Sequence, residues 1–365
     1  MTARTAWIDL HSSFAIELID VPPHLAARLS ARLGAGVLAG TPDREPAMRI
    51  VAEPAWSTAG AMLVGGFAVD RNSLTAFTPS GRPAIRFDPS LTAAPIEIRV
   101  AADARDVPLL SELINARLLE GGVLPLHAAS CILDGIGVAV VGWSGGGKTE
   151  ALLRLMREGA QALGDEWTLV GPQPRAMTGI SSPMRLTDRQ VSSAVRGVAQ
   201  PGRATRIRMG AAAVAELASR SVARTRAPFV ASVASRIVPR LHGLRRVWVT
   251  LDTRQRPPAT QLDRLFIVRR HEAADLRVRE LALGDVIEPT VMAHEQHRTA
   301  LMAAYRAFRY VVQATGPVLL DDTAIRERSL VEEMLAGVRA WEVLLPAAPS
   351  PATDFGPLLR AATAR

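Results

Sequence analysis

The sequence has few of the residues that mark several classes of protein. Its 365 residues include one cysteine, Cys131, so no internal disulfide can form and nothing indicates an oxidising compartment. Without a second cysteine or a histidine cluster, a structural zinc site is not expected. No run approaches about 18 apolar residues, and the N-terminus lacks the apolar core of a signal peptide. We therefore expect a soluble cytoplasmic protein without membrane contact.

Lysine is almost absent as well. The chain has 43 lysines and arginines, and Lys148 is the only lysine among them. The formal net charge of +8 favours anionic ligands. Aromatic residues make up only 4%, and no basic motif is interleaved with aromatics, so nucleic acid is not an expected partner. Hydrophobic residues make up 48%, which is enough for a large core.

Residues 1–104 are predicted to form a small α/β domain. The run Phe14–Val21 is typical of a strand, and the segment 22–34 begins with prolines and ends at a glycine, as short helices do. The runs AMRIVAE, AMLVGGFAV, AIRFD and IEIRVAA are separated by Pro, Gly, Asn and Asp, and they predict strands of an antiparallel sheet. No motif with chemistry stands out in this part.

Residues 105–345 are predicted to form a second α/β domain. A helix is expected over Asp106–Gly122, followed by a β-hairpin in which LPLHAASCIL and IGVAVVG flank the turn Asp134–Gly135. Cys131 is expected to be a small buried residue of the first hairpin strand. The segment KTEALLRLMREG predicts a helix, AQALGDEWTLVG predicts one strand around an acidic pair, and DRLFIVRR predicts another strand.

The C-terminal part is predicted to be helical over 289–314 and 324–340, with a disordered Pro/Ala-rich tail at 346–365. The first of these helices contains HEQHR, His294–Arg298. Its histidines are at i and i+3, whereas a zinc helix of the HExxH type needs i and i+4. We therefore predict that this stretch is an ordinary polar helix face.

The segment 189–256 is rich in arginine, with 14 arginines against two acidic residues. It supports two interpretations. It is either a mobile basic segment that faces an anionic substrate, or a pair of solvated Ala/Arg helices with loops.

One motif carries chemistry: the segment GWSGGGKT at 142–149 fits G-x-x-x-x-G-K-[ST], the phosphate-binding loop. Its glycines let backbone N–H groups point at phosphate oxygens, and the following helix offers its positive N-terminal end. Lysine reaches the β- and γ-phosphates as a compact charge that arginine does not reproduce, and the threonine hydroxyl is placed to bind Mg²⁺. We predict that ATP is bound by Gly142, Ser144, Gly145, Gly146, Gly147, Lys148 and Thr149.

The residues around this loop resemble the catalytic domain of HPr kinase/phosphorylase, whose core phosphoenolpyruvate carboxykinase shares. LPLHAAS places His127 before the loop, and QALGDEW supplies the acidic pair Asp165 and Glu166 after it. The similarity covers residues 127–170. Trp143 stands where the family usually has Asp, and the Gly-rich signature that grips HPr is not visible. The chain looks more like a diverged branch, the lasso-peptide kinases, which phosphorylate a serine hydroxyl of a precursor peptide.

The resemblance implies a role for each matching residue. His127 would lie beside the γ-phosphate and tune the proton affinity of Asp165, the general base, while Glu166 and Thr149 would hold Mg²⁺. Glu150, in the first turn of the helix, is expected to be structural. The implied activity is ATP- and Mg²⁺-dependent transfer of the γ-phosphate to a hydroxyl, expected to be serine, of a peptide or small protein.

Two alternatives remain open at this point. One is a nucleotide-binding regulator or adaptor without phosphotransfer, and the other is a pyrophosphate-linked phosphorylase. Kinases of the resembling family assemble into rings, so the resemblance also allows a homo-oligomer.

Overall fold

The computed structural model describes residues 4–10, 13–54, 56–172, 175–180, 184–187, 246–249, 259–312, 319–347 and 353–363. Within these residues the chain is a mixed α/β protein with six helices and several β-sheets, which confirms the predicted α/β class. The arginine-rich segment 189–256 lies outside the described residues, except for strand β17 (Arg246–Val249), which pairs with β16 (Met184–Thr187).

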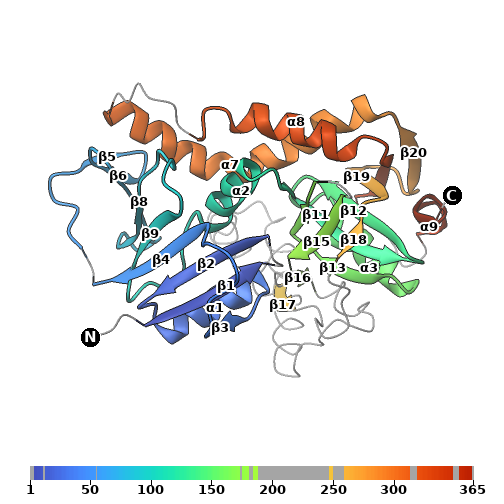
Figure 1. Ribbon diagram of the computed structural model, residues 1–365. Helices are drawn as coiled ribbons and strands as arrows, with labels where there is room; N and C mark the ends of the chain where they lie inside the picture. Colours follow the sequence, from blue (N-terminus) through green and yellow to red (C-terminus); the bar gives the residue numbers. More distant parts are fainter. Residues whose placement is uncertain are drawn as a thin grey trace, which may run out of the picture.

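The N-terminal part forms a nine-stranded sheet in the order β3-β1-β2-β4-β9-β8-β7-β6-β5 (Figure 1). Its strands are β1 (Thr5–Leu10), β2 (Phe14–Ile19), β3 (Val37–Leu38), β4 (Met48–Glu53), β5 (Met62–Val64), β6 (Phe67–Val69), β7 (Leu74–Phe77), β8 (Pro83–Phe87) and β9 (Ile96–Ala101). Helix α1 (Pro23–Leu33) ends at Gly34 in the left-handed conformation, as predicted.

The prediction that this sheet is antiparallel is wrong at its centre. Strand β4 runs parallel to both β2 and β9. Helix α1 lies in the connection from β2 to β4, and a helical crossover returns the chain to the same edge, so the next strand runs in the same direction. The sequence predicts the helix, but the pairing of β2 with β4 depends on burying the apolar side chains of α1, β2 and β4 in one core.

The second part forms two further sheets, in the orders β10-β14-β15-β18 and β13-β11-β12-β19-β21-β20. Their strands are β10 (Leu124–Leu126), β11 (Ala128–Leu133), β12 (Ile136–Gly142), β13 (Gln161–Gly164), β14 (Trp167–Val170), β15 (Ala176–Ile180), β18 (Thr260–Gln261), β19 (Arg264–His271), β20 (Arg277–Leu281) and β21 (Arg339–Pro346). The predicted hairpin is confirmed: β11 and β12 pair around Asp134 and Gly135, which both have positive φ.

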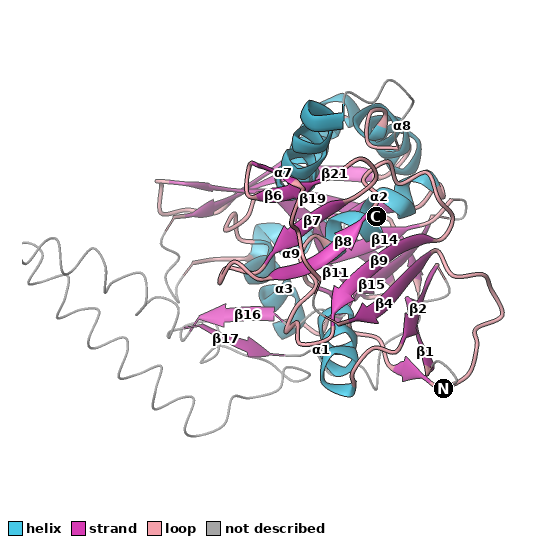
Figure 2. Ribbon diagram, turned by 90° about the vertical axis from the view of Figure 1, so that its left-hand side faces the viewer, coloured by secondary structure: helices cyan, strands magenta, loops and turns pink. Residues whose placement is uncertain are grey.

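Helices cover both faces of the six-stranded sheet. Side chains alternate along β12, with Val138 and Val140 in the core that α3 (Lys148–Arg157) covers. Ala139 and Val141 belong to the opposite core, shared with α7 (Leu283–Val312) and α8 (Thr323–Leu335). Figure 2 shows α7 and α8 along the top of the molecule and α1 and α3 in its lower half.

Two C-terminal predictions are wrong. The helix expected to reach residue 340 ends at Leu335, and Arg339–Pro346 form β21, a strand parallel to β19 in the sheet interior. The expected disordered tail contains helix α9 (Gly356–Thr363), and Leu358 and Ala362 of this helix are fully buried in the core beside α3. The burial of a few small apolar residues orders this segment, although its composition is typical of disorder.

The cores do not divide at residue 104. The cluster around the N-terminal sheet also contains residues of α2 (Leu110–Glu120), such as Leu113, and of the second half of α7, such as Leu301 and Phe308. The first half of α7 packs on the six-stranded sheet through Val286 and Val291. Helix α7 therefore joins the two parts of the chain (Figure 1). None of the described helices is both long and apolar enough to cross a membrane.

Candidate functional site

The predicted site residues lie where a pair of antiparallel strands divides between two sheets. β10 pairs with β14 in one sheet, and the continuing strands β11 and β13 pair in the other. His127 is the single residue between β10 and β11, while Asp165 and Glu166 separate β13 from β14. The single strand predicted around the acidic pair is therefore two strands. The break turns the backbone so that His127 and Asp165 leave the two regular ladders at the same place.

The phosphate-binding motif forms a strand–loop–helix unit from the end of β12 to the start of α3. Gly147 has φ of 112°, a conformation that side chains rarely adopt. A Cβ on Gly142 would lie 2.7 Å from the carbonyl oxygen of Val268 on β19. Within the described residues, no side chain caps the N-terminus of α3. Its first N–H groups therefore point outward as a ready site for an anion.

Lys148 is held inside this loop. Its side chain is buried, with Nζ donating to the carbonyl oxygen of Gly142 at 2.9 Å and lying 3.5 Å from Nδ1 of His127. Burial lowers the pKa of Lys148 to about 8, although the charges of Asp165 and Glu166 oppose that shift. Most of the ammonium thus stays charged at neutral pH.

His127 is a neutral imidazole. Burial, and after it the charge of Lys148, lowers its pKa far below the ordinary value. A neutral ring can accept a hydrogen bond at Nδ1, where Lys148 lies. The position of His127 next to Lys148 places it at the phosphate-binding loop, while its expected role beside the γ-phosphate stays a prediction.

Asp165 meets the loop through Thr149. The threonine Oγ1 donates to Oδ2 of Asp165 at 3.0 Å, and Oδ1 is buried without a partner within the described part of the chain. Burial raises the pKa of Asp165 to about 6, against the opposing hydrogen bond from Thr149 and the charge of Lys148. This carboxylate is more basic than an ordinary aspartate and lies beside a cation and a hydroxyl.

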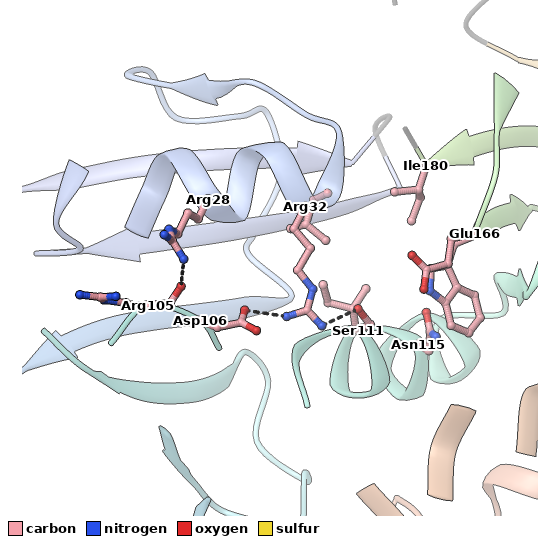
Figure 3. A pocket seen from close by; sticks show the side chains of 11 residues that line it. Arg28, Arg32, Arg105, Asp106, Ser111, Asn115, Glu166 and Ile180 are labelled. Atoms are coloured by element: carbon pink, nitrogen blue, oxygen red, sulfur yellow. Dashed lines mark hydrogen bonds and ion pairs between the residues drawn. The ribbon is translucent and has the colours of Figure 1, made fainter. Parts of the chain in front are cut away.

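Glu166 is placed differently from its expected role. It is exposed and lines a neighbouring cavity between α1 and α2 (Figure 3), while Thr149 pairs with Asp165. The two residues predicted to hold Mg²⁺, Thr149 and Glu166, thus do not contact each other, and the hydroxyl of Thr149 bonds Asp165 instead. In the described ranges, no group of three or more His, Cys, Asp or Glu residues is placed to hold a metal. A magnesium ion here would depend on few protein oxygens together with bound phosphates, as is common for Mg²⁺.

The sequence reasoning missed the contribution of helix α7. The HEQHR stretch, which we expected to be an ordinary polar helix face, is partly inside the protein, because His294 is only 2% exposed and Arg298 only 6%. The ring of His297 lies on that of His127, with centroids 3.6 Å apart. The backbone N–H of Ser144, inside the loop, donates to Oε1 of Gln296 at 3.2 Å. The i, i+3 spacing of His294 and His297 places both histidines on one face of the helix. The neighbouring sequence does not indicate whether that face points to solvent or to the site.

His294 supports the site from behind. The backbone N–H of His127 donates to Nε2 of His294 at 2.9 Å. The His294 ring therefore carries its proton on Nδ1, which lies 2.8 Å from Oε1 of Glu327. Arg298 pairs with the other oxygen of Glu327 at 2.7 Å. Burial acts to raise the pKa of Glu327, but the bonds and charges of His294 and Arg298 outweigh it and hold the pKa below its usual range. The group is a buried ion pair that fixes α7 to α8.

Two more residues shape the loop. Arg270, at the end of β19, pairs with Glu150 at 2.8 Å and donates to the carbonyl oxygen of Gly145 at 3.3 Å. This pairing fits the structural role expected for Glu150. Trp143 is 55% exposed and borders two hollows, one against the first half of α7 and β19, the other between α7 and α8.

Comparisons with known proteins do not name a family. No model of a known protein family matches the chain, and a search of curated proteins finds no relative. The function must therefore be inferred from the chemistry of the site residues. It combines a helix N-terminus open to an anion, a buried ammonium, a threonine hydroxyl and a carboxylate with raised proton affinity.

Proposed function

We propose that this protein is an ATP- and Mg²⁺-dependent kinase built on a phosphate-loop core of the HPr kinase type. It transfers the γ-phosphate to a hydroxyl, with serine expected, of a peptide or small protein. The observation that carries the proposal is the meeting of Lys148, Thr149 and Asp165 at the start of α3. A site that only bound an anion would need the first two but not a buried carboxylate of raised pKa.

The loop and Lys148 would bind the β- and γ-phosphates of ATP. Lys148 would exchange its bond to the Gly142 carbonyl for phosphate oxygens, and the N–H groups at the start of α3 would add hydrogen bonds. Mg²⁺, when bound, would neutralise phosphate charge, with Thr149 as its first protein ligand. Glu166 would join it only by turning out of the cavity that it lines.

The transfer itself needs a base. The acceptor oxygen forms a bond to the γ-phosphorus while the bond from phosphorus to the β,γ-bridging oxygen breaks, and ADP leaves. The hydroxyl proton goes to Asp165, whose Oδ1 is the oxygen without a partner in the described part. The neutral imidazoles of His127 and His297 lie beside this reaction without adding charge.

A hollow beside the phosphate-binding loop favours ATP over pyrophosphate as the phosphate donor. A hollow of about 510 Å³ borders Gly142 and Gly146, and its walls include the apolar residues Ile267, Val268, Pro289, Met292 and Ala293. An aromatic base would bury apolar surface there, which pyrophosphate would leave exposed to water.

The test is intact mass spectrometry of a pool of synthetic serine peptides after incubation with the protein, ATP and Mg²⁺. Lys148→Ala is the inactive comparison, and Arg71→Ala, at an exposed position in the turn after β6, is the matched surface control. A gain of one phosphate that needs Lys148 but not Arg71 supports the kinase. Lys148-dependent ATP binding with no modified peptide would instead indicate a nucleotide-binding regulator.

A further inference from the structure

A cavity beside the site lies between the N-terminal part and the second part of the chain (Figure 3). It has a volume of about 560 Å³, within the usual range of ligand pockets. Arg28 and Arg32 line it from α1, Ser111 and Asn115 from α2, and Glu166 from the break after β13. Both parts of the chain thus build one pocket.

This cavity adjoins the chemical site. Glu166 follows Asp165 directly, and Trp167, which also lines the cavity, has its ring 5.3 Å from that of His127. A molecule in the cavity would therefore have one end at Glu166 and Trp167, beside the strand break that carries Asp165. Its other end would extend along α1 and α2, away from the phosphate-binding loop.

The wall of the cavity contains a polar side chain whose amide can bond a ligand. Asn115 is only 6% exposed and turns its amide into the cavity (Figure 3), and among the described residues this amide has no side-chain or backbone partner. A ligand that both donates and accepts a hydrogen bond, as a peptide group does, would satisfy it.

The mouth of the cavity is positive. Arg28 and Arg105 are exposed there, and Arg28 uses one nitrogen to donate to the carbonyl oxygen of Arg105 at 2.9 Å. Arg32 is engaged by Asp106 and Ser111, at 3.0 and 3.1 Å, so it joins α1 to α2. Glu166 lies at the other end of the cavity, so an acidic group is attracted to Arg28 and Arg105 and repelled from the end next to Asp165. The charges would orient a ligand in one direction.

We propose that this cavity binds the acceptor, which is an acidic peptide segment. A peptide amide next to the accepting hydroxyl would pair with Asn115, and an acidic side chain would lie at Arg28 and Arg105. This assignment rests on the proposed kinase function. It gives the N-terminal part of the chain a role, namely recognition of the substrate.

The experiment measures binding and transfer separately. The immobilised protein is incubated without ATP with pairs of synthetic serine peptides that differ only in Asp or Glu against Asn or Gln, and retained peptides are quantified by mass spectrometry. The variants are Arg28→Glu combined with Arg105→Glu, and Asn115→Leu, which keeps the side-chain size. Arg71→Glu, an exposed arginine that does not line the cavity, is the control. Circular dichroism checks that each variant folds.

Wild type and Arg71→Glu should retain acidic peptides roughly tenfold over their amide counterparts, and the double charge reversal should remove this preference. Asn115→Leu should weaken retention of all peptides while keeping the preference. Equal retention of acidic and amide peptides, or a preference unchanged by the charge reversal, overturns the acceptor site. Acidic peptides that are retained through these residues but gain no phosphate when ATP and Mg²⁺ are added would confirm the site and refute the kinase.

Discussion

The hydroxyl of Thr149 donates a 3.0 Å hydrogen bond to Oδ2 of Asp165. This bond joins the first turn of α3 to the break between β13 and β14, so the phosphate-binding loop and the proposed base move as one unit. It also holds a carboxylate in a buried place where its ionised form is disfavoured. Such strain is common where a protein stores reactivity at the expense of stability.

Asp165→Asn should therefore stabilise the protein while stopping phosphate transfer. The pKa of Asp165 is raised from 3.8 to about 6, so wild type loses stability as the pH rises from about 4 to above 6 and the buried carboxyl ionises. Asparagine never ionises, so the variant should gain about 1–3 kcal/mol in the free energy of unfolding at pH 7 and nothing at pH 3.5. Urea unfolding at both pH values measures this.

The comparison for Asp165→Asn is Asp134→Asn, in the exposed hairpin turn, where asparagine suits the positive φ. It should change neither stability nor transfer. If Asp165→Asn is no more stable than wild type at pH 7, the carboxylate is not strained. If it transfers phosphate at the wild-type rate, Asp165 is not the base.

His297→Phe should slow transfer by about 10- to 100-fold and leave ATP affinity within about twofold. Phenylalanine keeps a ring on His127 but removes Nε2, a buried nitrogen without a partner in the described structure. Burial, together with Lys148, lowers the pKa of His297 to about 4, so the lost group is neutral at pH 7. Single-turnover kinetics with a peptide that the wild-type protein phosphorylates measure the transfer rate, and nucleotide titration measures ATP affinity. His24→Phe, exposed on α1, should match wild type, and an unchanged rate in His297→Phe would mean that the ring only packs.

Glu327→Gln should destabilise the protein by about 3 kcal/mol, because Arg298 would remain buried without its counter-charge. His294 would also lose its charged acceptor, and its hydrogen bond from the backbone N–H of His127 would weaken. Glu332→Gln is the matched control on the same helix, since Glu332 is exposed, and it should shift stability by less than about 0.5 kcal/mol. Thermal unfolding of the two variants decides the matter, and equal melting temperatures would show that the buried pair adds nothing.

Leu358→Ala should cost about 2–4 kcal/mol of stability, as for other fully buried leucines. Leu359→Ala, at the next and partly exposed position of α9, should cost clearly less. Denaturant unfolding of both proteins tests whether the C-terminal helix belongs to the core. A disordered tail would make the two substitutions equally harmless.

Several elements could be predicted because their signals are local. The prolines and Gly34 around α1, the Asp134–Gly135 turn and the glycines before α3 each act within a few residues, and the structure confirms those elements. The strand Arg339–Pro346 was missed because its neighbour in space, β19, lies 75 residues earlier in the sequence (Arg264 pairs with Arg339), and a short apolar run fits a helix end as well as a buried strand. The parallel pairing of β2 with β4 was also not predicted, because these two strands are separated in sequence by helix α1.

The sequence by itself determined where the phosphate-binding loop lies, because the positive φ of Gly145 and Gly147 and the bond from Lys148 to the Gly142 carbonyl act within a few residues. Only the tertiary structure decided which acidic residue Thr149 meets and which one faces the cavity, since one step along a broken strand reverses the direction of a side chain. It also decided that His294 and His297 of α7 lie against His127. Helical spacing defines a face, but only packing against two separate cores determines where that face points.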